Sequence, residues 1–188
     1  PADVEAQADL IASAAVFMTQ LEQPMDAALH ALQIARAAGV TTILNPASAA
    51  KLPAGMFALC DYATPNETET EALTGVRVIT VADAIKAAAV LREPGVGTWI
   101  IPLGEQGVLF GDGTQQYQSA AGAAGKEVET TEAGDALKGG FADELARGMA
   151  PVGAERCGWA TEGISVTRPG TAPSMPALSE IEAFLDQT

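Results

Sequence analysis

The chain has 188 residues and a formal net charge of −14 at pH 7, which argues against nucleic-acid binding because phosphate neutralisation needs a basic surface. Hydrophobic residues make up 48% of the sequence, which predicts a packed globular fold rather than disorder. No apolar run approaches the roughly 18 residues of a membrane helix, and no basic segment precedes residues 11–18, so we expect a cytoplasmic protein without membrane contact.

Helix-like and strand-like segments alternate through the first half of the chain. Apolar residues at helical spacing predict helices over 4–12, 24–38, 52–59, 68–73 and 81–91. Gly39 is the stop signal of the helix over 24–38. Short apolar runs predict strands over 15–19, 41–44, 62–64 and 98–101. Strands separated by helices indicate an α/β fold with a mainly parallel sheet between two layers of helices.

The pattern changes after residue 104. Residues 107–110 and 115–118 flank a glycine-containing turn, which predicts a β-hairpin. Helices are expected again over 135–147, 154–167 and 178–185. The chain shows no internal repeat and no low-complexity linker, so we expect one domain over 1–188.

Polar, turn-forming residues follow the predicted parallel strands, at the end where such sheets bind ligands. The segment Thr64-Pro-Asn-Glu-Thr-Glu69 has two interpretations. Asn66 or Thr68 caps the next helix, whose dipole favours the acidic residues. Alternatively, Asn66 and Glu69 point toward a metal-bound phosphate, because Mg²⁺ prefers oxygen ligands and keeps several waters. Leu103-Gly-Glu-Gln-Gly107 is either a tight turn or a loop whose glycines let the backbone approach a nucleotide.

Gly134-Asp135 stands at the start of a predicted helix within VETTEAGDALKGG, residues 128–140. The amides of Ala133, Gly134 and Asp135 would lie at the positive helix end, where anions bind. Asp135 would then accept a proton from a hydroxyl that attacks a phosphate. Alternatively, Asp135 only caps the helix.

The cysteines and the histidine offer little chemistry. Cys60 and Cys157 lie in apolar contexts without metal-ligand spacing, and we expect buried free thiols. His30 falls in a helical pattern and is expected at the surface or boundary.

Several motifs, taken in order, resemble the ribokinase family, the PfkB-type carbohydrate kinases. They are Asn45-Pro-Ala47, TPNETETEALTG over 64–75, Leu103-Gly-x-x-Gly107, Ala133-Gly-Asp135, Val166-Thr-Arg-x-Gly170 and Pro173-Ser-Met-Pro176. The resemblance covers nearly all of the chain. It implies ATP-dependent phosphorylation of a sugar hydroxyl, with a pentose such as ribose as acceptor.

The resemblance also implies roles for particular residues. Asp135 would be the catalytic base, and the amides of Ala133 and Gly134 would form the anion hole. Asn66 would contact ATP phosphate, and Glu69 would help to hold Mg²⁺. The nucleotide would be lined by Leu103, Gly104, Glu105, Gln106, Gly107 and Trp159. A monovalent cation such as K⁺ would be held by Glu129, Thr131, Ser165, Arg168, Gly170 and Ser174.

The motif around Asp135 departs from the family pattern. Glu129 stands for the usual Asp, Glu132 for a small residue, and Lys138 for Asn or a similar polar residue, while Ala136 and Leu137 replace Thr-Phe. Glu132 would repel phosphate unless it points outward, and Lys138 could offset its charge. Pro102 removes a backbone donor from the nucleotide loop.

Residues 1–44 do not resemble the N-terminal strands, β lid and sugar-binding stretch of the family. We therefore expect an N-terminally truncated ribokinase-like domain, and a homodimer or a missing N-terminal segment would have to rebuild the sugar pocket. Whether the chain alone is an enzyme stays open. The alternative is a catalytically impaired nucleotide-binding remnant, or pseudokinase, without a sugar site.

Overall fold

A computed structural model describes residues 1–47, 52–91, 95–103, 107–111, 116–119, 128 and 133–187. They divide into two compact units, residues 1–119 and 120–188. The single domain expected from the sequence stays a prediction. No helix in the described ranges is both long and apolar enough to cross a membrane.

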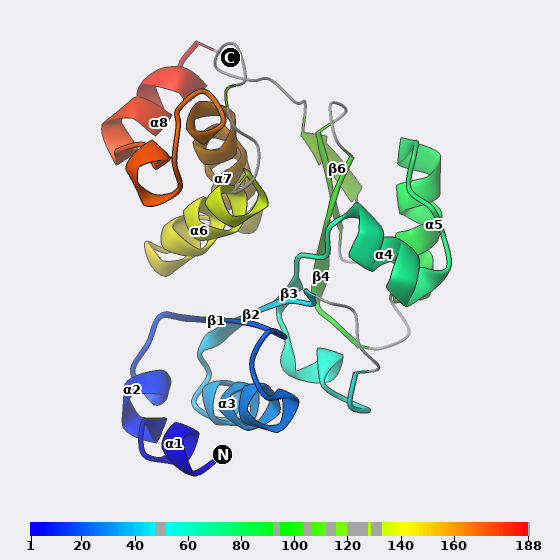
Figure 1. Ribbon diagram of the computed structural model, residues 1–188, viewed down its shortest axis with the longest axis vertical. Coiled ribbons are helices and arrows are strands. Elements are labelled where there is room, and N and C mark those ends of the chain that lie inside the picture. The colour runs from blue at the N-terminus through cyan, green and yellow to red at the C-terminus, as the bar shows by residue number, and fades with distance from the viewer. Residues whose placement is uncertain are drawn as a thin grey trace. The chain divides into compact units, whose positions relative to one another are not determined.

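The first unit is built on one sheet (Figure 1). Its described strands follow the chain order β1 (Val16–Gln20), β2 (Thr41–Asn45), β3 (Tyr62–Ala63), β4 (Thr98–Pro102), β5 (Val108–Gly111) and β6 (Gln116–Ser119). Strands β1 to β4 pair in parallel, and β4–β5 and β5–β6 pair antiparallel. The predicted α/β class, the mainly parallel sheet and the β5–β6 hairpin are confirmed.

Helices of the first unit cover one face of this sheet. The connections contain α3 (Met25–Ala37), the 3₁₀ turn η1 (Phe57–Leu59), α4 (Glu67–Thr74) and α5 (Val81–Leu91). Each connection between parallel strands advances by one strand in the same direction, so right-handed crossovers place these elements on the same side. One apolar core joins them, with Leu32, Phe57 and Ala84 packed together with Trp99 of β4. The Phe57 and Trp99 rings meet edge to face at 5.0 Å.

Two predicted helices differ from the structure. Residues 4–12 form two short helices, α1 (Ala2–Glu5) and α2 (Ala8–Ala12), because the chain turns at Gln7, whose φ and ψ are −112° and 15°. Of the helix predicted over 52–59, only the 3₁₀ turn at its end forms. Gly55 has a φ of +79°, a left-handed conformation that an α-helix cannot contain.

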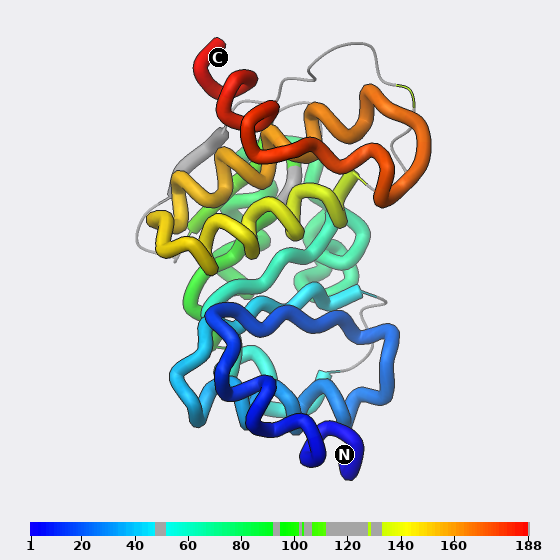
Figure 2. The backbone as a smooth tube through the Cα atoms, turned by 90° about the vertical axis from the view of Figure 1, so that its left-hand side faces the viewer, coloured from blue at the N-terminus to red at the C-terminus, as the bar shows by residue number. Residues whose placement is uncertain are grey.

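The second unit contains α6 (Ala133–Ala146), α7 (Pro151–Ser165), the 3₁₀ turn η3 (Ala172–Ser174) and α8 (Leu178–Leu185). Figure 2 shows α6 and α7 side by side, in yellow and orange. The predicted start of α7 at residue 154 was late, because Pro151 occupies the first turn, where its missing N–H costs no hydrogen bond.

The predictions for the cysteines and the histidine are confirmed. Cys60 and Cys157 are buried free thiols. His30 lies at the boundary, with its Nε2 atom 2.7 Å from Glu5 Oε2.

Candidate active site

The first turn of α6 brings together the three residues expected to carry the chemistry. Ala133, Gly134 and Asp135 open the helix, so their N–H groups have no partner one turn earlier within it. The Asp135 side chain is 53% exposed, and its Oδ1 atom lies 3.2 Å from Lys138 Nζ. A Cβ atom on Gly134 would lie in ordinary contact with Lys138 Nζ, at 3.7 Å. Packing alone therefore does not require glycine at this position.

Close packing against α7 holds α6 in place. A Cβ atom on Gly158 would lie 2.5 Å from the carbonyl oxygen of Leu137, and one on Gly140 would lie 3.0 Å from Gly158 Cα. The two backbones approach so closely that only glycine fits at either position. Phe141, which is fully buried, closes the same contact. The helix that carries Asp135 thus rests on a rigid support, as a catalytic side chain requires.

Asn66 and Glu69 form a reciprocal cap at the start of α4. Asn66 Oδ1 accepts from the Glu69 amide at 2.8 Å, and Glu69 Oε2 accepts from the Asn66 amide at 2.8 Å. Glu69 Oε1 also accepts from Asn66 Nδ2. The capping interpretation is confirmed, with Asn66 rather than Thr68 as the N-cap. The contacts of Asn66 with phosphate and of Glu69 with metal stay predictions.

The predicted nucleotide loop follows β4. The Leu103 amide donates to the carbonyl oxygen of Gly107 at 2.7 Å, so the two ends of the loop are joined. Gly107 has a φ of +95°, which explains the need for glycine at this end. Gly104, Glu105 and Gln106 lie outside the described residues.

A cavity of about 340 Å³ adjoins Leu103, and the sequence analysis did not select it. Arg77 and Ile79 line it together with Glu67, Thr68 and Glu71 of α4. Arg77 could have been singled out from the sequence as one of only ten basic residues, near the end of a predicted helix.

Trp159 packs within the second unit. Its ring lies 5.9 Å from the ring of Phe184, and both residues cover the core between α7 and α8. Packing against Phe184 is by itself a sufficient reason for an aromatic residue at this position, with no nucleotide bound. A place beside adenine therefore stays a prediction.

Four of the six residues expected at a monovalent cation lie between residues 165 and 174 of the second unit. Ser165 and Ser174 are buried, and their hydroxyl groups donate to the carbonyl oxygens of Glu162 and Thr171. The Arg168 guanidinium pairs with Glu180 at 2.5 Å and cannot ligate a cation, so only the main chain of Arg168 could do so. Gly170 has a φ of +88°.

Glu129 and Thr131, the other two cation positions, lie outside the described residues, as does Glu132. Within the described ranges, no three His, Cys, Asp or Glu side chains gather as a metal site.

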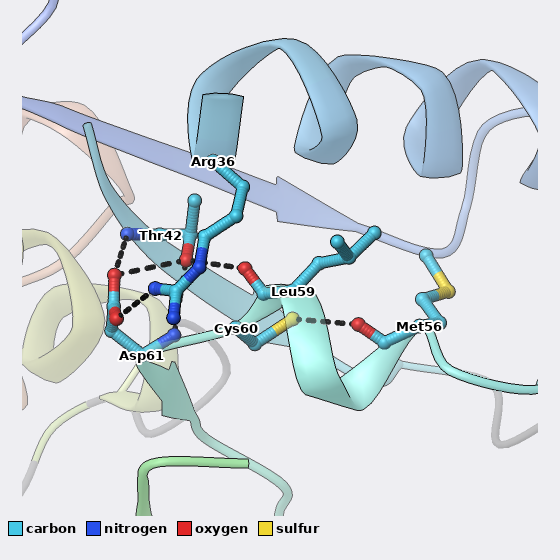
Figure 3. Close-up of polar contacts among 6 residues, drawn as sticks. All are labelled: Arg36, Thr42, Met56, Leu59, Cys60 and Asp61. Carbon is cyan, nitrogen blue, oxygen red and sulfur yellow. Dashed lines mark hydrogen bonds and ion pairs between the residues drawn. The ribbon is translucent and has the colours of Figure 1, made fainter. Parts of the chain in front are cut away.

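A polar network that the sequence analysis missed lies at the other end of the sheet. Asp61 joins Arg36 of α3 to Thr42 of β2, at the amino ends of the parallel strands (Figure 3). Ligands of such sheets bind at the carboxyl ends, so this network is structural. The spacing of its members, 19 and 25 residues apart, gives no local sequence signal.

Comparison with known proteins identifies relatives over almost the whole chain. The profile of the pfkB family carbohydrate kinases matches residues 2–178. A ribokinase of Haemophilus influenzae is 39% identical over 176 residues, which are 94% of this chain and 57% of that protein. A ribokinase of Staphylococcus aureus is 35% identical over 182 residues, covering 96% of this chain and 60% of that protein.

Solved structures of ribokinases share the fold. The Arabidopsis thaliana ribokinase complexed with ribose and ATP gives a TM-score of 0.91 at 26% identity, covering 96% of this chain and 59% of that chain. A Thermotoga maritima ribokinase gives 0.83 at 35% identity, covering 95% and 59%. The chain thus spans less than two thirds of the length of each of these proteins.

Proposed function

This chain belongs to the pfkB family of carbohydrate kinases, and on that premise we propose that it carries the phosphoryl-transfer site of an ATP-dependent sugar kinase. The acceptor is a hydroxyl group of a pentose such as ribose. The placement of Asp135 beside two first-turn amides of α6 carries the proposal.

Asp135 acts as the general base. Its carboxylate accepts the proton of the sugar hydroxyl while the hydroxyl oxygen bonds to the γ-phosphorus of ATP. The bond from that phosphorus to the bridging oxygen of ADP breaks, and its electron pair leaves with ADP. The amides of Ala133 and Gly134 donate to the oxygens of the transferred group, at the helix end where negative charge is favoured.

Nucleotide binding belongs to the ends of β3 and β4. Asn66 would contact a phosphate, and the loop from Leu103 to Gly107 would lie against the nucleotide. Mg²⁺ would neutralise phosphate charge when bound. Both carboxylate oxygens of Glu69 already accept from Asn66, so Glu69 fits a metal-bound water better than the metal itself.

Two further features belong to the same proposal. K⁺ at residues 165–174 would order the segment that follows α7, and replacing K⁺ by a large organic cation would then lower the rate. The sugar site would be completed by a second copy of the chain or by a further segment, because residues 1–44 do not resemble the sugar-binding stretch of the family.

The first test is ADP release from Mg-ATP with K⁺, with and without ribose. Asp135→Asn should lower ribose-dependent release about 100-fold or more, since a positioned base contributes on that scale. Asp143→Asn is the matched control, because Asp143 lies on the same helix, is 59% exposed and pairs with Arg147. Equal release from the wild type and Asp135→Asn would contradict the role of Asp135. ATP binding without ribose-dependent release would instead indicate a nucleotide-binding remnant.

A further inference from the structure

We propose that Lys138 is a further catalytic residue, whose ammonium group contacts the transferred phosphoryl group beside Asp135. The inference rests on the proposed kinase function and adds to it a specific cation for the terminal phosphate. Asp135, Gly134 and Lys138 all belong to the first turns of α6, so the contact needs no other part of the molecule.

The geometry places the ammonium group over the opening of the helix. Lys138 Nζ lies 3.2 Å from Asp135 Oδ1 and 3.7 Å from the position of a Cβ atom on Gly134. Side chains on a helix lean toward its N-terminus, which brings a lysine at this position back over the first turn. The ammonium therefore lies between the carboxylate of the base and the backbone that would hold the phosphoryl oxygens.

Burial distinguishes this ion pair from an ordinary one on a helix surface. Lys86 and Asp83 on α5 have the same spacing and a similar distance of 3.3 Å, but the Lys86 side chain is 68% exposed. The Lys138 side chain is only 14% exposed. An ion pair of this spacing on a helix surface stabilises the helix only weakly and leaves the lysine in water. The low exposure of the Lys138 side chain indicates that it is held in place more firmly than that of Lys86.

A cation beside Asp135 would add to the charge neutralisation that Mg²⁺ and the helix amides supply. A carboxylate base next to an incoming triphosphate brings like charges together, and the chain has a net charge of −14. The helix dipole disfavours a cation near an N-terminus, so helix stability alone does not explain an ammonium group there. A lysine has three donors, so one can stay on Asp135 while another donates to a phosphoryl oxygen.

With Lys138 included, the bonds that form and break stay the same, and only the stabilisation of the negative charge on the transferred group changes. The sugar hydroxyl proton still passes to Asp135, the hydroxyl oxygen still bonds to the γ-phosphorus, and ADP still leaves with the bond electrons. Lys138 stays protonated throughout and offsets the negative charge of the transferred group. It should therefore recognise the γ-phosphate and distinguish ATP from ADP.

The test compares the affinities for ATP and ADP by titration calorimetry with Mg²⁺. Lys138→Met keeps the length of the side chain and removes its charge. We expect at least a 10-fold loss of ATP affinity, a change of less than 2-fold for ADP, and a lower kcat. Lys138→Arg should restore most of the preference for ATP. Lys86→Met, which breaks the exposed pair of the same spacing, should leave both affinities unchanged.

Three results would overturn the inference, and they differ in what they say of the proposed function. Unchanged ATP affinity in Lys138→Met, or an equal loss for ATP and ADP, rejects the γ-phosphate contact and leaves the kinase function intact. Wild-type protein that binds neither nucleotide rejects both. The unfolding temperature of each variant shows whether a loss of affinity reflects a loss of fold.

Discussion

Asp61 joins a helix to the amino end of a buried strand through one carboxylate (Figure 3). Its Oδ2 atom accepts from the Thr42 amide at 2.9 Å, and its Oδ1 atom accepts from Arg36 Nη1 at 2.5 Å. Thr42 is fully buried, so Asp61→Ala would leave its amide without this partner. We expect a loss of about 1–3 kcal/mol in the free energy of unfolding, measured with urea. Arg36→Met removes only the half-exposed ion pair and should cost less than about 1 kcal/mol. Equal losses would contradict the role of the buried amide.

Cys60 makes stability depend on pH in the alkaline range. Burial, followed by the charge of Asp61, raises the pKa of this thiol from 9.0 to about 12. Because the folded pKa lies above the unfolded one, the stabilisation is complete below pH 9 and is lost as the pH rises toward 12. Cys60→Ala should therefore flatten the fall in the free energy of unfolding between pH 9 and pH 11, by up to about 1.4 kcal/mol per pH unit.

The test of Cys60 is the slope of the free energy of unfolding against pH, not its value at one pH. Cys60→Ala also removes packing contacts, which lowers the free energy of unfolding at every pH. Tyr62 has a raised pKa from the same causes, so part of the slope should remain in Cys60→Ala. The pKa of Cys157 is also raised by burial, and Cys157→Ala serves as the comparison. An identical slope in wild type and Cys60→Ala would contradict the raised pKa of the Cys60 thiol in the folded protein.

The contact between α6 and α7 can be tested with two neighbouring glycines. A Cβ atom on Gly140 would lie 2.5 Å from Thr161 Oγ1, which already donates to the carbonyl oxygen of Cys157, whereas one on Gly139 would meet nothing within 4 Å. Gly140→Ala should lower the free energy of unfolding by about 1–3 kcal/mol through overpacking. Gly139→Ala should raise it by about 0.5–1 kcal/mol, since alanine favours a helix. Urea unfolding of both variants measures the difference, and the reverse order would contradict the packing.

The bounds of a helix or strand are predicted well from the sequence where a single local pattern determines them. Short apolar runs bounded by turns place β2 and β4 within a residue of their ends. The break at Gln7 was missed because the sequence there contains no proline or glycine. At Asn66, local rules predicted the helix cap that the structure shows, whereas its contact with a phosphate stays a prediction. Asp61 escaped prediction because its partners are distant in sequence and meet only in the folded sheet.

At the scale of the whole molecule, the described sheet ends in a strand without the usual protection. β1 lies at one edge of the strand order, and its sequence, VFMTQ, contains neither a charge nor a proline. Met18 on this strand is 40% exposed. A cavity of about 670 Å³ lies beside it, lined by Phe17 and by apolar residues of the neighbouring helices such as Val4, Ile11 and Ala28. Edge strands of this kind pair with other chains.

We therefore expect the chain to self-associate through β1, and Met18→Lys to weaken that association by placing a charge on the edge. Sedimentation velocity over a range of concentrations measures it. Val90→Lys is the control, because Val90 is 45% exposed but lies on α5, away from the edge. Either lysine lowers the magnitude of a net charge of −14 and so reduces repulsion between copies. Weaker association in Met18→Lys alone can then come only from the blocked edge, whereas equal association in all three proteins would place the contact elsewhere.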